Sequence, residues 1–175
     1  NCVLNGDKNS EIFLSEIIGA QPIKGRHMNM ESLYEYGSRA GFWRLHKLFQ
    51  EKKIPITIFG VGMALKKNPE ICKAIIEADY EVASHGWRWI DYQNIKKSEE
   101  KKHMQLAIKA HTKIFGKRPN GWYTGRCSPN TRDLVMEDGG FLYDSDSYSD
   151  DLPYWETRNK KKQLIIPYTL DNNDM

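Results

Sequence analysis

Cysteine is scarce in this sequence, and the few cysteines present exclude two kinds of cross-link. The 175 residues include Cys2, Cys72 and Cys127, which are widely spaced and form no C-x-x-C pair. An odd, sparse set of this kind supports neither a disulfide framework nor a cysteine zinc site, and it favours a reducing compartment. The opening residues also lack the pattern of a signal peptide, so we expect a cytoplasmic protein.

Long apolar runs and a strong charge of one sign are also absent. No stretch approaches the roughly 20 apolar residues that cross a bilayer, so we expect no membrane partner. The 26 basic and 23 acidic residues are intermixed, for a net charge of +3, whereas a nucleic-acid-binding face needs clustered basic residues. We therefore expect no nucleic-acid partner. The apolar fraction of 39% suits one domain over residues 1–175 with a core of its own.

Helical and strand patterns alternate from residue 41 onward. Apolar residues at helical spacing predict helices at residues 42–53, 69–78, 98–115 and 128–139. Short apolar or β-branched runs predict strands at residues 54–59, 80–84, 121–124, 141–144 and 164–168. Such alternation is typical of a parallel α/β architecture whose functional loops lie at the C-terminal edge of the strands. A barrel is favoured over an open sheet.

Local signals add detail to the first three of these elements. In the first helix, Leu45, Leu48 and Phe49 fall on one apolar face with charged residues between them. Residues 54–59 are rich in β-branched side chains and predict a buried strand. The second helix is expected to begin at the Asn-Pro pair at 68–69, where the asparagine caps the helix and the proline takes its first position.

One of the predicted strands ends in a loop with an unusual set of side chains. Residues 84–92 read SHGWRWIDY and place His85 among two indoles, a guanidinium and a carboxylate. Loops at strand ends commonly hold the chemistry of α/β folds. A lone histidine at a strand end is more often structural, but its neighbours Trp87, Arg88 and Trp89 favour a pocket.

A second strand-to-loop junction lies at residues 121–126, which read GWYTGR. Its glycines allow the backbone to approach a ligand closely. Tyr123 offers a hydroxyl, and the guanidinium of Arg126 has the shape to clamp a carboxylate or a polarised carbonyl. An aromatic strand followed by a solvent-facing arginine is an equally open alternative.

Two further segments and three histidines complete the set of candidates. Residues 30–39 are dense in Tyr, Glu and Arg and predict a loop, either in an active site or on the surface. Residues 144–151 carry four aspartates whose spacing matches no calcium loop, so a polar turn is favoured over a cation or base site. Among the histidines, His111 is expected in the core, and His46 and His103 are expected at the surface.

The chain also contains five long motifs in a recognisable order. They are residues 30–39, 84–93, 121–132, 139–155 and 166–175. Together they closely resemble the allantoinase branch of the polysaccharide-deacetylase (NodB-homology) superfamily. The resemblance implies a distorted (β/α) barrel and hydrolysis of a non-peptide C–N bond, with allantoin opened to allantoate. It also implies a single catalytic domain truncated at both ends, because the family's first and last strands would lie outside the chain.

The resemblance bears on metal binding as well. The superfamily's deacetylases hold a divalent metal with one aspartate and two histidines, and both histidines come from an H-[ST]-x-x-H motif. His85 matches the first histidine, and Trp89 occupies the place of the second. An indole is not a zinc ligand, which agrees with a branch that works without a bound metal. The deacetylase arginine motif is also altered, with Tyr123 in place of its Arg and Arg126 in place of its Tyr.

We therefore predict a metal-independent, cofactor-independent allantoinase of purine catabolism that acts on a small cyclic ureide. A carboxylate or His85 would take the proton of the attacking water, and Arg126 would stabilise the oxyanion. Substrate contacts are predicted at Glu35, Trp87, Arg88, Trp89, Tyr123 and Asp174. Two alternatives stay open: a metal-dependent polysaccharide or peptidoglycan N-deacetylase with zinc at His85, and an inactive fragment. A homo-oligomer is compatible with the sequence.

Overall fold

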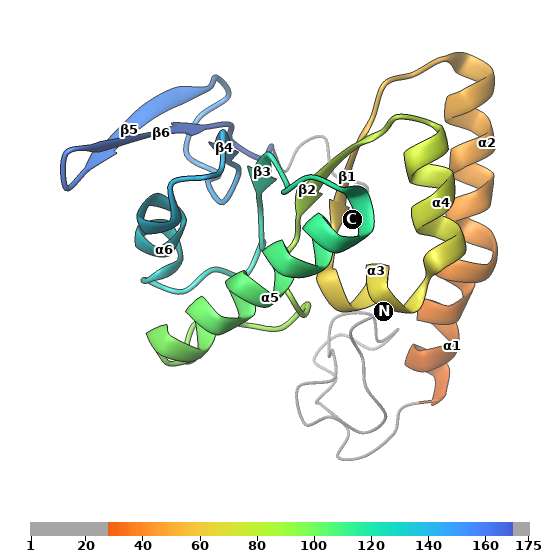
Figure 1. Ribbon diagram of the computed structural model, residues 1–175, viewed down its shortest axis with the longest axis horizontal. Helices are drawn as coiled ribbons and strands as arrows, with labels where there is room; N and C mark the ends of the chain where they lie inside the picture. The colour runs from red at the N-terminus through yellow and green to blue at the C-terminus, as the bar shows by residue number, and fades with distance from the viewer. Residues whose placement is uncertain (1–27, 170–175) are drawn as a thin grey trace.

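A six-stranded sheet in the order β1-β2-β3-β4-β6-β5 organises the structure, a computed structural model that describes residues 28–169 (Figure 1). The five strands other than β5 run parallel, and β5 pairs antiparallel with β6. The strands are β1 Thr57–Gly60, β2 Glu81–Ser84, β3 Gly121–Trp122, β4 Tyr143–Asp144, β5 Tyr154–Arg158 and β6 Lys161–Ile165. The predicted α/β architecture with parallel strands is confirmed, and the C-terminal ends of the parallel strands meet at one edge.

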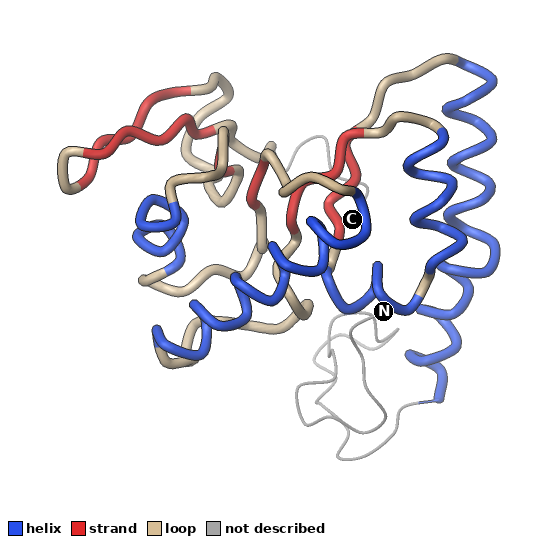
Figure 2. Tube along the Cα trace, viewed as in Figure 1, coloured by secondary structure: helices blue, strands red, loops and turns tan. Residues whose placement is uncertain are grey.

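Helices connect the strands and lie along the sheet, as Figure 2 shows. They are α1 Met28–Tyr36, the π-helical segment η1 Gly37–Gly41, α2 Phe42–Lys52, α3 Gly62–Lys67, α4 Pro69–Glu77, α5 Lys97–Phe115 and α6 Thr131–Asp138. In Figure 1, α2 and α4 stand beside the β1 end of the sheet, and α6 lies near the β5–β6 hairpin at the opposite end. None of these helices is both long and apolar enough to cross a membrane.

Several predicted helix boundaries are confirmed. Pro69 occupies the first turn of α4 behind Asn68. The side chain of Asn68 does not cap that helix, however, because it donates instead to the carbonyl oxygen of Ala64 at 2.7 Å. At the other ends, α5 stops at Gly116 with φ 71° and α6 stops at Gly139 with φ 70°. Glycine ends a helix at such positions because the left-handed conformation costs it no steric clash.

Two apolar clusters fill the space between the sheet and the helices. The first consists of Met104, Ala107, Trp122, Leu134, Val135 and Phe141. The second consists of Leu65, Cys72, Ile75, Tyr80 and Val82. The first cluster joins α5, β3 and α6, and the second is local to residues 65–82 but is covered by partly buried side chains from α2 and α5.

Three sequence expectations about the N-terminal half are wrong. Residues 30–39, expected as a loop, form α1 and part of η1, because good helix formers without proline outweigh their polarity. The face of α2 that meets the core is narrower than predicted, and Leu45 and Leu48 are 54% and 44% exposed. The predicted buried strand begins only at Thr57, and Ile54 is 45% exposed.

Two further elements, α3 and β5, lay outside the sequence prediction. Helix α3 is a short helix of six residues, below the length at which helical spacing gives a clear pattern. Strand β5 forms a hairpin with β6 through Asn159 and Lys160, whose φ angles are 49° and 62°. Two positive φ values suit a tight hairpin turn. The sequence hid this turn because a lysine stands where such turns usually carry glycine.

The histidines divide between the core and partly buried sites. His111 is fully buried on α5, as predicted. His46 and His103 are half-buried rather than exposed. The hydroxyl of Tyr80 lies 3.3 Å from His46 Nδ1, and the hydroxyl of Tyr92 lies 3.0 Å from His103 Nδ1. Tyrosine neighbours from other elements shield both rings, which helical spacing alone does not reveal.

Buried His111 is expected to make stability depend on pH. Burial lowers the pKa of His111 from 6.5 to about 4. Between those values the unfolded chain holds a proton that the folded protein does not, so stability falls as the pH falls through this window. At about 1.4 kcal/mol per pKa unit, His111 contributes a loss of about 3 kcal/mol between pH 7 and pH 4. Urea unfolding at several pH values measures this loss, and His111→Gln is the control. An equal pH slope in the variant contradicts the assignment.

Candidate active site

The site is built where three neighbouring parallel strands end. His85 follows β2, Tyr123 follows β3 and Asp146 lies two residues beyond β4. Backbone hydrogen bonds extend the sheet past its formal ends: Tyr123 N donates to Ser84 O at 2.9 Å, and Ser145 N donates to Trp122 O at 2.8 Å. The three side chains are therefore brought to one edge, as expected for a parallel sheet.

His85 is held in one tautomer. Its Nδ1 lies 2.6 Å from the carbonyl oxygen of Tyr123. A carbonyl oxygen only accepts, so Nδ1 carries the hydrogen and Nε2 keeps its lone pair. Burial lowers the pKa of His85 below its ordinary 6.5, and this effect outweighs the opposing hydrogen bond to Tyr123 and the charge of Asp146. The imidazole is therefore neutral at pH 7, with Nε2 able to accept a proton.

Aromatic rings surround the imidazole. The ring centroid of Tyr123 lies 5.2 Å from that of His85 and 5.0 Å from that of Phe59. Tyr168 stacks on Tyr123 at 4.9 Å with an interplanar angle of 6°. The hydroxyl of Tyr123 lies 3.2 Å from that of Tyr148, and burial raises the pKa of Tyr123, so this phenol stays neutral. The imidazole is therefore part of a packed aromatic cluster.

Trp89 serves as a platform for Arg126. The guanidinium carbon of Arg126 lies 4.7 Å from the centroid of the Trp89 ring, a cation–π contact. Tyr34 of α1 meets the same indole edge-on at 6.2 Å. Behind the contact, Tyr92 N donates to the carbonyl oxygen of Arg126 at 3.1 Å. The loops after β2 and β3 are thereby tied together, and the guanidinium lies over an aromatic face rather than swinging freely.

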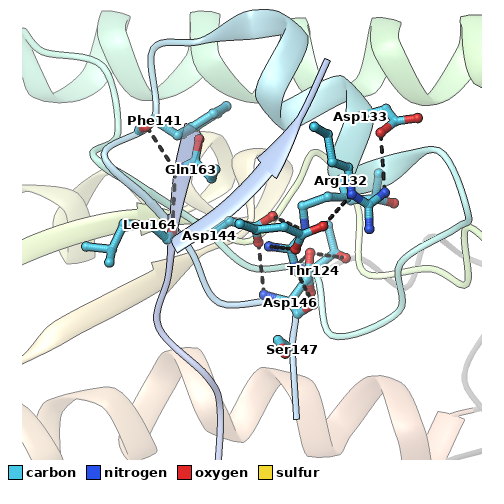
Figure 3. A network of polar contacts seen from close by, with 12 residues as sticks. Thr124, Arg132, Asp133, Phe141, Asp144, Asp146, Ser147, Gln163 and Leu164 are labelled. Atoms are coloured by element: carbon cyan, nitrogen blue, oxygen red, sulfur yellow. Dashed lines mark hydrogen bonds and ion pairs between the residues drawn. The ribbon is translucent and has the colours of Figure 1, made fainter. Parts of the chain in front are cut away.

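The carboxylate of Asp146 ties down the loop that delivers Arg126. It accepts the backbone N–H of Thr124 and of Gly125, at 2.9 Å and 2.8 Å. The hydroxyl of Thr124 donates to it as well, at 3.0 Å. Figure 3 shows Thr124 and Asp146 together in this network. The two backbone N–H groups are therefore engaged by Asp146 and are not directed at a substrate.

A buried charge cluster supports Asp146 (Figure 3). Arg132 of α6 places Nε 3.2 Å from Asp144 Oδ2 and donates from Nη2 to the backbone oxygen of Asp146 at 2.8 Å. Asp144 is fully buried and accepts Asp146 N at 2.9 Å. Burial and the neighbouring Asp146 carboxylate raise the pKa of Asp144 to about 7 despite Arg132. Glu156 of β5 approaches the same guanidinium at 3.5 Å.

Not every residue predicted for the site reaches it. Trp87 packs against the first core cluster, and a Cβ atom at Gly62 would come within 2.8 Å of its ring. The Trp87 indole therefore points toward the core between the sheet and helices α3 and α5, and away from the site. Burial lowers the pKa of His103, and Arg88 lies close enough for its charge to add to that shift. Glu35 is exposed on α1 and pairs with Arg39 at 3.3 Å.

The remaining predicted residue, Asp174, lies outside the described residues. His85, Trp89, Tyr123 and Arg126 are the predicted residues that the structure gathers around the ends of β2 and β3. Their predicted roles stay predictions, because geometry alone does not test a role.

Sequence reasoning missed three contributors. Asp146 was assigned to a polar turn, Tyr168 was read as part of the last strand, and Phe59 was treated as buried core. Each lies at or just beyond the C-terminal end of a parallel strand, at β4, β6 and β1 respectively. Position at a strand end was therefore the signal that pointed to them, and composition was not.

The donor set of the described residues does not fit a metal ion. Within residues 28–169, no three His, Cys, Asp or Glu side chains come together in a way that could hold one. The position of the second histidine of the deacetylase motif holds the Trp89 indole, which offers no lone pair to a metal. A guanidinium stacked on that indole would repel a divalent cation at the same place.

Comparison with known proteins places these features in a family. The family model for polysaccharide deacetylase matches residues 29–138. A Schizosaccharomyces pombe protein named as a polysaccharide deacetylase is 41% identical over 99% of this chain and 60% of its own length. A peptidoglycan deacetylase of Helicobacter pylori is 26% identical over 79% of this chain and 48% of its own length.

Solved structures agree with the family model. The PuuE allantoinase structure is 59% identical with a TM-score of 0.91, over 97% of this chain and 57% of that one. A Pseudomonas aeruginosa PAO1 structure named as a polysaccharide deacetylase is 59% identical with a TM-score of 0.92, over 99% of this chain and 59% of that one. The chain thus spans about three fifths of these relatives, and its α/β fold matches their (β/α) barrel. By sequence and by fold, the chain belongs to the polysaccharide deacetylase family.

Proposed function

We propose that the protein carrying this chain is a metal-independent hydrolase that opens the hydantoin ring of allantoin to allantoate. The observation that carries the proposal is Trp89, which stands at the second metal-ligand position and supports Arg126 instead. The similarity to PuuE allantoinase at 59% identity supports the same reading. Localisation in the cytoplasm and a role in purine catabolism would follow from this activity.

The proposed reaction uses groups of this chain alone. His85 Nε2 takes a proton from a water molecule as the water oxygen attacks a ring carbonyl carbon. The carbonyl oxygen becomes an oxyanion beside the guanidinium of Arg126, which stabilises its charge. When the tetrahedral intermediate collapses, the C–N bond breaks and protonated His85 returns the proton to the leaving nitrogen. Thr124 and Gly125 N–H groups are bound to Asp146, so Arg126 takes the oxyanion role that backbone donors often fill.

The aromatic rings beside His85 suit this substrate better than a polymer. A hydantoin is small and planar, and the rings of Tyr123 and Phe59 lie 5.2 Å and 6.2 Å from the His85 ring and 5.0 Å from each other. The substrate would pack against this aromatic cluster while Arg126 binds one of its carbonyl oxygens. The second candidate is a metal-dependent sugar N-deacetylase, which is favoured by the names of several relatives and by His85 at the first ligand position.

Chelation separates the two candidates. We expect the full-length protein to open allantoin at the same rate before and after dialysis against a chelator, because the proposed mechanism contains no metal ligand set. Allantoate formation and deacetylation of an N-acetylglucosamine oligomer are measured in parallel, together with the bound metal content. Activity that disappears on chelation and returns with zinc overturns the metal-independent reading, and the absence of both activities favours an inactive protein.

Two variants at one position sharpen the test. Trp89→His restores the spacing of the deacetylase histidines, and Trp89→Phe keeps an aromatic face under Arg126. Loss of a cation–π contact of about 1 to 2 kcal/mol predicts a fall in allantoin turnover of roughly 5- to 30-fold in Trp89→His. We expect a smaller fall in Trp89→Phe and no recovery of Trp89→His with zinc. Zinc-dependent deacetylation by the wild-type protein, with Trp89 in place, supports the second candidate.

A further inference from the structure

The carbonyl oxygen of Gly60 accepts two hydrogen bonds from two histidines. The backbone N–H of His85 donates to it at 2.9 Å, and His111 Nε2 lies 3.0 Å from it. Gly60 is the last residue of β1 and pairs with Ser84, the residue before His85. A single peptide group therefore links the candidate active-site loop after β2 to the C-terminal part of helix α5.

His111 has little reason to be a histidine other than this bond. It is fully buried, and its Nδ1 is buried without a hydrogen-bond partner among the described residues. A buried polar atom without a partner costs stability, and an aliphatic side chain of similar size would avoid that cost. Since the Gly60 oxygen only accepts, His111 must carry its hydrogen on Nε2. The ring is thus held as a neutral donor to one carbonyl.

A side chain at Gly60 would crowd three neighbouring side chains. A Cβ atom there would lie 2.8 Å from Leu65 Cδ1 and 3.2 Å from both His111 Cε1 and Val82 Cγ1. The imidazole of His111 rests directly against the backbone because glycine carries no side chain. This close approach lets His111 of α5 fix the direction of the Gly60 carbonyl.

We propose that His111 is a positioning residue of the active site, acting on His85 through the carbonyl of Gly60. With that carbonyl held, the peptide of His85 is fixed, and the His85 ring reaches Tyr123 O with Nδ1. That bond leaves the lone pair on His85 Nε2, where the proposed reaction needs it. The inference rests on the proposed function only in taking His85 as the base, and it does not depend on allantoin as the substrate.

The test compares two substitutions in the full-length protein. His111→Leu removes the donor at similar volume, and His111→Gln can place an amide N–H near the former Nε2. Misplacement of a catalytic group lowers turnover steeply, so we expect a fall in kcat of roughly 10- to 100-fold in His111→Leu with little change in KM. In the same variant, ¹⁵N NMR of the His85 ring should change from the pure Nδ1–H tautomer to a mixture. His111→Gln should retain most of the wild-type kcat and most of the Nδ1–H tautomer of His85.

A matched control separates positioning from stability. Met104 is buried on the same helix α5, in the first core cluster. Met104→Ala therefore leaves a cavity that destabilises the protein. We expect it to leave kcat and the His85 ring nitrogens unchanged. The proposal is overturned if folded His111→Leu keeps the wild-type His85 tautomer and kcat, or if Met104→Ala changes both equally.

A second measurement needs no variant. In the wild-type protein, the ¹⁵N shifts of His111 should show a protonated Nε2 and an unprotonated Nδ1 at pH 7. If the neutral ring instead carries its hydrogen on Nδ1, Nε2 cannot donate to the Gly60 oxygen, and the inference is wrong. If the protein fails to open allantoin while both NMR results hold, the proposed substrate is wrong and the positioning role stands.

Discussion

Replacing His85 with asparagine is expected to lower kcat for ring opening by roughly 1,000-fold while leaving the free energy of unfolding nearly unchanged. The amide nitrogen of asparagine can still donate to Tyr123 O, as His85 Nδ1 does at 2.6 Å. The variant lacks Nε2, however, and removal of a general base commonly costs about 10²- to 10⁴-fold. Steady-state kinetics and urea unfolding of the full-length protein measure the two quantities.

The pH profile gives an independent check on the same group. Because burial lowers the pKa of His85 below its ordinary 6.5, we expect kcat/KM of the wild-type protein to fall to half of its plateau only below pH 6.5. The control is His103→Asn. This substitution alters a half-buried histidine outside the aromatic cluster of Phe59, Tyr123 and Tyr168, so it should change kcat little. A His85→Asn enzyme within tenfold of the wild-type kcat would exclude His85 as the base.

Replacing Arg132 with methionine is expected to lower the free energy of unfolding by about 3 to 5 kcal/mol at pH 8. The fully buried Asp144 would lose the guanidinium that lies 3.2 Å from its Oδ2. The backbone oxygen of Asp146 would also lose its donor, at 2.8 Å, and the loop that carries Arg126 would loosen. Urea unfolding measures the stability, and allantoin turnover reports on the loop.

The pH dependence of that loss follows from Asp144. Its pKa is already raised to about 7, and without Arg132 the carboxyl becomes still harder to ionise. Below that pKa the group is neutral and its burial costs less, so the destabilisation by Arg132→Met should be smaller at pH 6 than at pH 8. The double variant Arg132→Met, Asp144→Asn should recover part of the stability at pH 8. A loss below about 1 kcal/mol in the single variant would contradict a buried ion pair of this kind.

Local sequence signals determined much of the architecture. The alternation of helical and strand patterns predicted parallel strands, since a strand that returns through a helix pairs parallel with its predecessor. Gly116 and Gly139 marked the ends of α5 and α6, because a single residue able to adopt positive φ is enough to stop a helix. His85 was found by its place after a strand, and that place depends only on neighbouring residues.

Direction and pairing of side chains were decided by the tertiary structure. The sequence placed Trp87 and Trp89 in one loop, but only the packing against Gly62 turned the first to the core and the stack with Arg126 turned the second to the site. The hairpin of β5 and β6 was missed, since a short polar strand is stabilised by its partner and not by its own propensity.

The alternation of helical and strand patterns thus determined by itself the class of fold and the edge of the sheet at which the site residues were predicted. The tertiary structure decided which groups lie together there. His111 meets the Gly60 carbonyl across 51 positions of sequence, and Asp146 reaches Thr124 across 22. Hydrogen bonds over such distances leave no periodic trace in a sequence, because each depends on where two separate elements come to rest.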